Sequence, residues 1–93
     1  MQFYSWFLRG QFYEFDGWEL GRCYVRNNDQ DRAGLFVYQA NDARIFILRE
    51  QYAPYRRDDV YEYPSLEDAK CSEWGWLFGK LMRVNLDAQG GFE

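Results

Sequence analysis

The sequence of 93 residues contains no histidine, and it has only two cysteines and two prolines. Without histidine the chain lacks the commonest general base and the commonest metal ligand, and it cannot form a Ser-His or Cys-His nucleophile. It also has neither a GxxxxGK[ST] loop nor a GxGxxG segment between a strand and a helix. These absences argue against most classes of enzyme. We predict a non-enzymatic protein that has no catalytic residue, no cofactor and no bound metal.

The two cysteines, Cys23 and Cys71, are far apart in the sequence, and neither belongs to a CxxC or other metal-binding spacing. We expect two reduced thiols, with a single disulfide between them as the alternative. The first residues lack the basic segment and cleavage site of a signal peptide, and no apolar run has transmembrane length. These observations favour a cytoplasmic location without a membrane partner.

Basic residues are fewer than acidic ones, because 11 Lys and Arg stand against 15 Asp and Glu, which gives a net charge of −4. Binding to the phosphates of nucleic acid needs clustered positive charge, so we expect no direct contact with nucleic acid. An RNA-recognition sheet also carries exposed aromatic residues, but it requires a basic surround that this chain does not provide.

Aromatic residues are abundant, since Phe, Trp and Tyr make up 22% of the chain. A small core does not need so many rings, so some of them should lie at the surface, where Tyr, Trp and Arg dominate binding hot spots. The length fits one domain, residues 1–93, and is too short for two.

The sequence up to residue 50 predicts β-strands at about 2–9, 11–15, 18–26, 34–40 and 44–50. A further candidate edge strand follows at about 60–63. Gly10 indicates a bend or bulge. The pair Asp16-Gly17 predicts a two-residue hairpin turn, because a type I′ turn needs positive φ at both central positions. Residues 34–50 are apolar on both faces, which is typical of the centre of a sheet. Residues 51–64 are predicted to be largely irregular.

The last third predicts a helix at about 65–83 and a flexible tail at about 87–93. Ser65 is a good N-cap, with Asp68 three residues later. Gly75 and Gly79 each weaken a helix by about 1 kcal/mol, so a helix that ends near Trp74 and is followed by a strand is the alternative. The predicted fold class is α+β, an antiparallel sheet of four to five strands with one C-terminal helix packed on one face.

Two acidic segments could carry chemistry. Glu14, Asp16 and Glu19 lie close together in the sequence and could form an acid/base pair. However, a strand that alternates apolar and acidic residues is the usual pattern of a solvent-facing surface. The segment 27–31 has oxygen ligands at alternate positions, but it lacks the glycine and the distant Glu of an EF-hand loop. We therefore predict neither catalysis nor metal binding at either segment.

Residues 51–64 are rich in Tyr and also contain Arg56 and Arg57. These arginines either pair locally with Asp58 and Asp59 or form a recognition loop with the tyrosines. Trp76 lies off the apolar arc of the predicted helix, so it is either a contact residue or, if the helix breaks there, part of the core. The predicted partner-binding residues are Glu14, Asp16, Glu19, Tyr52, Tyr55, Arg56, Arg57, Asp58, Asp59, Tyr61, Glu62 and Trp76.

The leading functional hypothesis is a small module that binds a protein partner through exposed Tyr, Trp and Arg. Its carboxylates would take the place of phosphates at a basic, nucleic-acid-binding surface of that partner, which the module would occlude as an inhibitor. Small phage-encoded anti-defence proteins, including anti-CRISPR inhibitors, are similar in size and charge, a likeness of composition that rests on no motif. The alternatives are a small-molecule-binding or enzymatic domain with carboxylates at an aromatic pocket, and a structural subunit, such as a homodimer, that buries its surplus aromatics by assembly.

Overall fold

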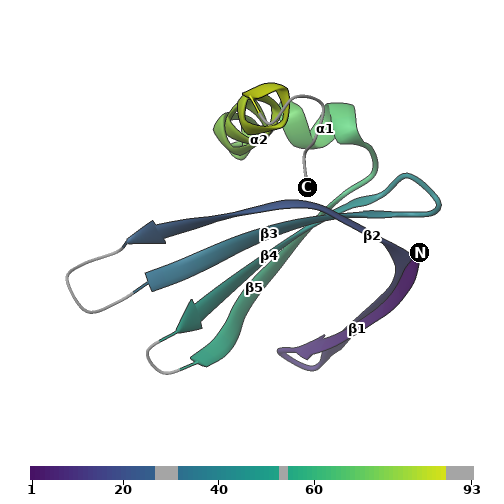
Figure 1. The fold of residues 1–93 in the computed structure, drawn as a ribbon. Helices are drawn as coiled ribbons and strands as arrows, with labels where there is room; N and C mark the ends of the chain where they lie inside the picture. Colours follow the sequence, from purple (N-terminus) through teal and green to yellow (C-terminus); the bar gives the residue numbers. More distant parts are fainter. Residues whose placement is uncertain (27–31, 53–54, 88–93) are drawn as a thin grey trace.

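The computed structural model describes residues 1–26, 32–52 and 55–87. These residues form a five-stranded antiparallel sheet whose strands are neighbours in the order of the sequence, followed by two short helices on one face (Figure 1). The elements are β1 (Gln2–Leu8), β2 (Gln11–Arg26), β3 (Arg32–Ala40), β4 (Ile45–Tyr52), β5 (Tyr55–Tyr63), α1 (Leu66–Lys70) and α2 (Gly75–Asp87). The predicted α+β class is confirmed. The segment 51–64, predicted to be largely irregular, is mostly strand β5.

The first hairpin turns at Arg9 and Gly10, and the predicted turn at Asp16-Gly17 is wrong. Arg9 has φ 51° and Gly10 has φ 81°, which are the positive values that a two-residue type I′ turn requires. Strand β2 runs without interruption through Asp16 and Gly17. Gly17 is needed there for another reason, because a Cβ atom at this position would overlap the backbone carbonyl of Gln39 in β3.

Strand β2 is 16 residues long and belongs to two pairings. Its first part pairs with β1, its second part pairs with β3, and Gly17 takes part in both. The register shifts between Glu19 and Gly21, which marks a β-bulge just after Gly17. Figure 1 shows that β2 bends sharply and folds β1 under the rest of the sheet, on the side opposite the helices. We call β1 with residues 11–16 the N-terminal hairpin.

The chain therefore has three layers, with one apolar core on each side of the central strands. The core on the helix side contains Cys23, Leu35, Val37, Ile45, Ile47, Ala69, Leu77, Phe78 and Leu81. The core on the hairpin side contains Trp6, Leu8, Phe15, Phe36, Tyr38, Ala40, Phe46 and Leu48. Alternate residues of β3 and β4 enter opposite cores, which confirms the prediction that both faces of these strands are covered.

Rings fill the core on the hairpin side. The rings of Phe15 and Phe46 are stacked, with centroids 4.2 Å apart and planes 1° from parallel. Trp6 meets Phe15 edge-on with its centroid at 5.4 Å and lies 5.0 Å from Tyr38. Many of the aromatic residues that exceed the needs of an ordinary core are thus buried where the hairpin folds over the sheet.

The helical region is divided in two, where a single helix over about 65–83 was predicted. The Ser65 side chain caps α1 as expected, since its hydroxyl oxygen accepts a hydrogen bond from the Asp68 N–H at 3.1 Å. The break follows Lys70. There the Ser72 hydroxyl donates to the Ala69 carbonyl at 2.5 Å and accepts from the Trp74 N–H at 3.1 Å, so it competes with helical bonding.

The alternative prediction of a strand after Trp74 is wrong, because α2 is helical through Asp87. The predicted tail beyond this residue lies outside the described part of the chain. Neither of the described helices is long and apolar enough to cross a membrane.

Candidate partner-binding surface

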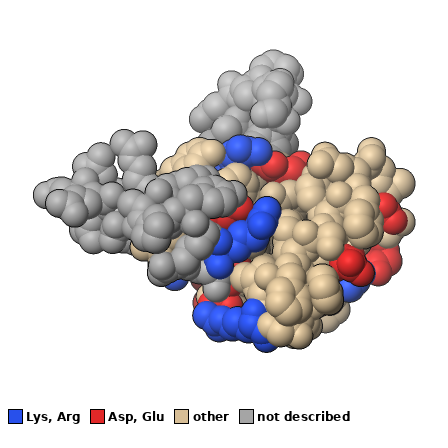
Figure 2. Space-filling model, turned by 90° about the horizontal axis from the view of Figure 1, so that it is seen from below, with Lys and Arg blue, Asp and Glu red and all other residues tan. Residues whose placement is uncertain are grey.

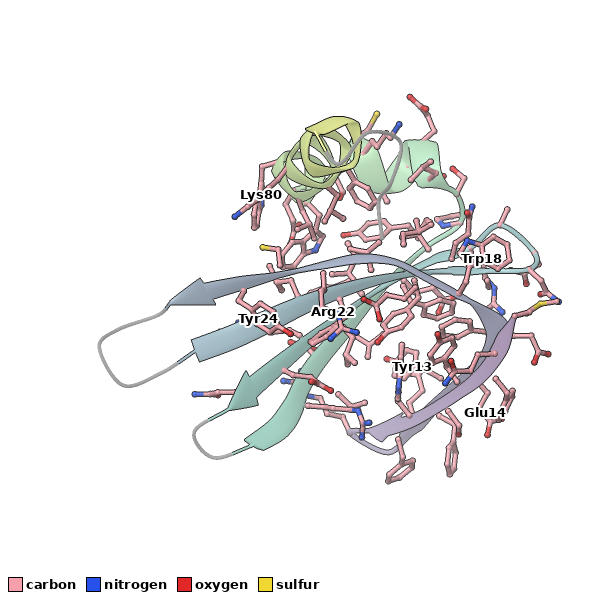
Figure 3. The ribbon with its side chains drawn as sticks, viewed as in Figure 1. Tyr13, Glu14, Trp18, Arg22, Tyr24 and Lys80 are labelled. Carbon is pink, nitrogen blue, oxygen red and sulfur yellow. The ribbon has the colours of Figure 1, made fainter. Side chains whose placement is uncertain are left out.

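The N-terminal hairpin presents one face to the core and the other to solvent. Along β1, Trp6 and Leu8 are buried, whereas Phe3, Ser5 and Phe7 on the opposite face are exposed. The same alternation continues on β2. Tyr13 is directed to the inside of the molecule and Glu14 away from it, as Figure 3 shows. The helices lie on the far side of the sheet, so they leave the outer face of the hairpin uncovered (Figure 1).

Three phenylalanines lie on this outer face. Phe3, Phe7 and Phe12 are 59%, 60% and 63% exposed. Phe7 and Phe12 are directly opposite each other in the β1–β2 pairing, and their ring centroids are 4.6 Å apart. We call these three residues the phenylalanine surface. Figure 2 shows the molecule from below, with an extended area of uncharged atoms bordered by a few charged side chains.

Two of the predicted acidic residues, Glu14 and Asp16, lie beside the phenylalanine surface. Asp16 is opposite Phe3 and Glu14 is opposite Ser5, and both carboxylates are exposed. The Ser5 hydroxyl donates to the Glu14 carboxylate at 3.1 Å. The outer face of the hairpin thus combines three exposed rings with two negative charges.

Glu19, the third acid of this segment, does not belong to the same surface. Alternation along β2 places Glu19 on the face of Tyr13 and Phe15, opposite to that of Glu14 and Asp16, and Glu19 pairs with Tyr38 of the hairpin-side core. Arg22 donates to both carboxylate oxygens of Glu19, from Nε at 2.7 Å and from Nη2 at 2.8 Å. The Arg22 guanidinium also lies 4.8 Å from the centre of the Phe36 ring. Both carboxylate oxygens of Glu19 are therefore hydrogen-bonded within the fold.

This arrangement shifts two pKa values. Hydrogen bonds from Arg22 to the Glu19 carboxylate raise the pKa of Arg22, which keeps its charge at every physiological pH. Burial, with the charge of Glu19 as a second cause, raises the pKa of Tyr38. Tyr38 is thus held in its neutral form beneath the hairpin.

The predicted binding residues of β5 are largely engaged within the fold. Arg57 Nε lies 3.6 Å from the Glu50 carboxylate, and Asp59 lies 3.5 Å from Nη1 of Arg9 in the first turn. The local pairing of Arg57 with Asp59, one of the two alternatives, is replaced by these contacts with other elements. The side chains of Tyr52, Tyr55, Arg56 and Asp58 lie outside the described part of the structure.

The other two residues of this strand also have neighbours in the fold. Glu62 accepts a hydrogen bond from Arg44 at 3.1 Å, and the same arginine holds Asp42 at 2.9 Å. Tyr61 is half-buried, and its ring centroid lies 5.0 Å from that of Trp74 in the helix-side core. Burial raises the pKa of Tyr61, with the charge of Asp59 as a second cause. Neither residue joins the outer face of the hairpin.

Trp76 is 51% exposed on α2, with its ring centroid 6.2 Å from that of half-buried Trp74. Trp76 is therefore not part of the core, whereas Trp74 packs against it, and the role of Trp76 as a contact residue stays a prediction. Because α2 covers the opposite side of the sheet, Trp76 lies apart from the phenylalanine surface (Figure 1). The structure thus divides the predicted site residues among several locations.

The described acids do not form one continuous acidic face. Glu19, Asp59 and Glu62 each lie within 4 Å of an arginine, and only Glu14 and Asp16 share the outer face of the hairpin. In Figure 2 basic and acidic side chains likewise lie next to one another across the middle of the view. The negative charge on the outer face of the hairpin therefore comes from two carboxylates.

The phenylalanine surface is the part of the site that sequence reasoning missed. The segment "FYSWF" has rings on both faces of a strand, a pattern that is typical of a strand covered on both sides. The useful signal is Ser5 between Phe3 and Phe7, because a polar residue at the centre of one face indicates that this face is exposed.

Cys23 is buried and Cys71 is exposed, and both are free thiols, as expected from their spacing. Among the described residues, no three or more His, Cys, Asp or Glu side chains gather where they could hold a metal ion. Comparison with known protein families, curated proteins and solved structures gives no match for this chain.

Proposed function

We propose that the chain is a small protein-binding module that docks on its partner with the outer face of the N-terminal hairpin. The observation that carries the proposal is the phenylalanine surface, in which three large apolar side chains are each exposed by more than half. Single exposed apolar residues are ordinary, but three exposed rings on one face of a strand pair, two of them in contact, are typical of an interaction surface. Aromatic side chains of this kind provide large contact area at a low cost in conformational entropy.

The hairpin is well suited to present these rings. Its inner face is anchored by Trp6 and Phe15, which are both 5% exposed, so the outer face is supported by a packed core. The phenylalanines therefore need little reorganisation when they bind, which favours affinity. Glu14 and Asp16 add negative charge beside the rings. The surface that fits this arrangement is an apolar depression on a protein, bordered by Lys or Arg.

Inhibition of a protein that binds nucleic acid is the more specific form of this proposal. A basic surface with an apolar depression is a plausible target for an acidic module of this size, and occlusion of that surface would block access of the nucleic acid. Support for this form comes from the net charge of −4 and from Glu14 and Asp16. Glu19, Asp59 and Glu62 are paired with arginines within the fold, so they give this form of the proposal no support. Phosphate mimicry by all six acids among the predicted partner-binding residues is therefore not part of the proposal.

Affinity purification with quantitative mass spectrometry tests the proposal, using cells that naturally contain the chain. The bait is compared with a triple variant, Phe3→Ser, Phe7→Ser and Phe12→Ser, and with Trp76→Ser as a matched control for an exposed ring elsewhere. We expect a partner that the wild type and Trp76→Ser enrich equally and that the triple variant enriches at least about tenfold less, since each lost hot-spot ring costs ~1–2 kcal/mol. Equal enrichment by the triple variant would refute the proposal.

A further inference from the structure

The two edges of the sheet differ in a way that points to a second interaction. The sheet is open, with β1 at one edge and β5 at the other. An exposed edge offers unpaired backbone N–H and C=O groups, and proteins usually protect such edges with charges, prolines or bulges. Strand β5 has this protection, because it carries five charged residues and its register shifts opposite Arg49 and Glu50. Strand β1 has none, since "QFYSWFL" contains no charge, no proline and no glycine.

The hairpin geometry determines which backbone groups β1 offers at its open edge. In a two-residue hairpin the residues that flank the turn form a hydrogen-bonded pair, and such pairs then alternate along the strands. Leu8 pairs with Gln11, so Leu8, Trp6 and Tyr4 bond to β2. The N–H and C=O groups of Phe3, Ser5 and Phe7 therefore point away from β2, toward the open edge.

The sequence of this edge is complementary to itself. In "FYSWF", residues 3–7, Ser5 is flanked on each side first by a large ring and then by Phe. If two such strands pair antiparallel about Ser5, then Phe3 of each lies opposite Phe7 of the other, and Tyr4 lies opposite Trp6. Aromatic cross-strand pairs stabilise a sheet, and the same surface on both copies satisfies a two-fold axis.

We propose that two copies of this chain associate through the open edges of their β1 strands, which pair antiparallel around Ser5 and join the two sheets into one. The pairing would add about six hydrogen bonds between the chains, two for each residue pair that faces the edge. No like charges meet at the centre of the seam, because Glu14 lies one strand away. Across three strand spacings the two Glu14 residues are about 14 Å apart, beyond the screening length of about 8 Å in physiological salt.

Strand β5 comes close to the turn end of the hairpin. The ion pair between Arg9 and Asp59, at 3.5 Å, places the turn end of the hairpin near β5, yet the two strands are not neighbours in the sheet. Association through β1 would also bring the two phenylalanine surfaces onto one continuous face. The inference does not rest on the proposed function, since it concerns the chain without any partner.

Sedimentation velocity on the purified chain tests the association over concentrations from about 1 μM to about 1 mM. We expect the mass to rise from the 11.3 kDa of one chain to twice that value. Ser5→Pro removes an edge N–H without removing a bond to β2, so it should leave the fold intact and abolish the dimer. Trp76→Lys is the control, because it changes an exposed ring on α2, away from the β1 edge, and it should keep the dimer.

Two outcomes would overturn the inference. One is a wild-type chain that stays monomeric over the whole range, and the other is a dimer that Ser5→Pro leaves unchanged. If circular dichroism shows that Ser5→Pro is unfolded, Ser5→Lys takes its place, since it sets two ammonium groups against each other across the axis.

Cross-linking tests the register. In a Cys71→Ser background, Ser5→Cys should form an inter-chain disulfide under mild oxidation, because directly opposite Cα atoms are about 5.5 Å apart. Glu14→Cys should not, since its two copies lie too far apart. Equal cross-linking by both variants would contradict the pairing around Ser5.

Discussion

Replacement of Gly17 by alanine should destabilise the protein strongly, although it adds a single methyl group to an exposed-looking "DG" pair. Gly17 pairs with Gln2 on one side and with Ala40 on the other, at the bend of β2. A Cβ atom at this position would overlap the Gln39 carbonyl oxygen and lie 2.9 Å from the Ala40 Cα. Both are backbone atoms, so no side-chain rotation can relieve the overlap. Strands β2 and β3 must separate locally, or the bend must change.

The expected loss in the free energy of unfolding is about 3–5 kcal/mol. Overpacking of a well-packed site costs ~1–3 kcal/mol, and disturbance of the bend that folds the hairpin over its core adds to this. Small domains are stable by only about 5–15 kcal/mol, so the loss is a large share of the total. Urea denaturation, followed by tryptophan fluorescence and by far-UV circular dichroism, measures the change.

Two other glycines serve as matched controls. Gly79 lies in α2 with open space around a Cβ atom, so Gly79→Ala should stabilise the protein by about 0.5–1 kcal/mol. Gly10 also has open space but a φ of 81°, so Gly10→Ala should cost about 1 kcal/mol through backbone strain alone. If Gly17→Ala costs no more than Gly10→Ala, the bend of β2 and its close approach to β3 are wrong.

Three further predictions concern single side chains. The raised pKa of Tyr38 means that the folded state holds this proton more tightly than the unfolded state, so its contribution to stability is complete below pH ~10 and is lost as the pH rises beyond. Unfolding free energies measured from about pH 9 to 12 should therefore fall less steeply in Tyr38→Phe than in the wild type, and equal slopes would contradict this. Ser65→Ala removes the N-cap of α1 and should cost about 1 kcal/mol in urea denaturation, whereas an unchanged midpoint would show that the cap contributes nothing. Phe7→Ser should destabilise the protein by no more than about 1 kcal/mol, because its ring is mostly exposed and loses a cross-strand contact with Phe12, and a loss of about 3 kcal/mol or more would mean that Phe7 belongs to the core.

Local patterns in the sequence predict much of the fold. The apolar residues of both faces of β3 and β4 indicate the centre of a sheet, and Ser65 with Asp68 indicates the start of a helix. These features depend on neighbours in the sequence, so local rules are sufficient for them. Gly75 and Gly79 indicated only a helix that could end near Trp74, whereas the division after Lys70 is accompanied by hydrogen bonds of Ser72 that depend on side-chain geometry.

The turn at Asp16-Gly17 shows where local rules fail. The pair has the composition of a type I′ turn, but Arg9 and Gly10 provide that turn instead, and this choice places Trp6 and Phe15 on the same buried face. Burial of large rings is worth more than the difference in turn propensity between the two pairs, since each buried ring contributes ~1.5–3 kcal/mol. The role of Gly17 depends on contact with Gln39 and Ala40 of β3, which are more than twenty residues away along the chain.

The candidate surface was only partly predictable for a similar reason. The shared face of Glu14 and Asp16 could be predicted from alternation along one strand, and the structure places both residues on the outer face of the hairpin. Whether Phe3 and Phe7 are covered depends on which face of β1 folds against the sheet, and the bend of β2 decides that. The ion pairs of Asp59 with Arg9 and of Glu62 with Arg44 also join residues that are distant in the sequence, so the loss of a continuous acidic face could not be foreseen.

Hydrogen–deuterium exchange on the complex with the captured partner is the most direct test of the proposed docking surface. Peptides that cover residues 2–16 contain the whole outer face of the hairpin, and peptides of α2 contain Trp76. We predict that partner binding slows exchange in residues 2–16 and leaves α2 unchanged. Slower exchange in α2 with none in residues 2–16 would contradict the account and would assign the partner to the helical side of the molecule.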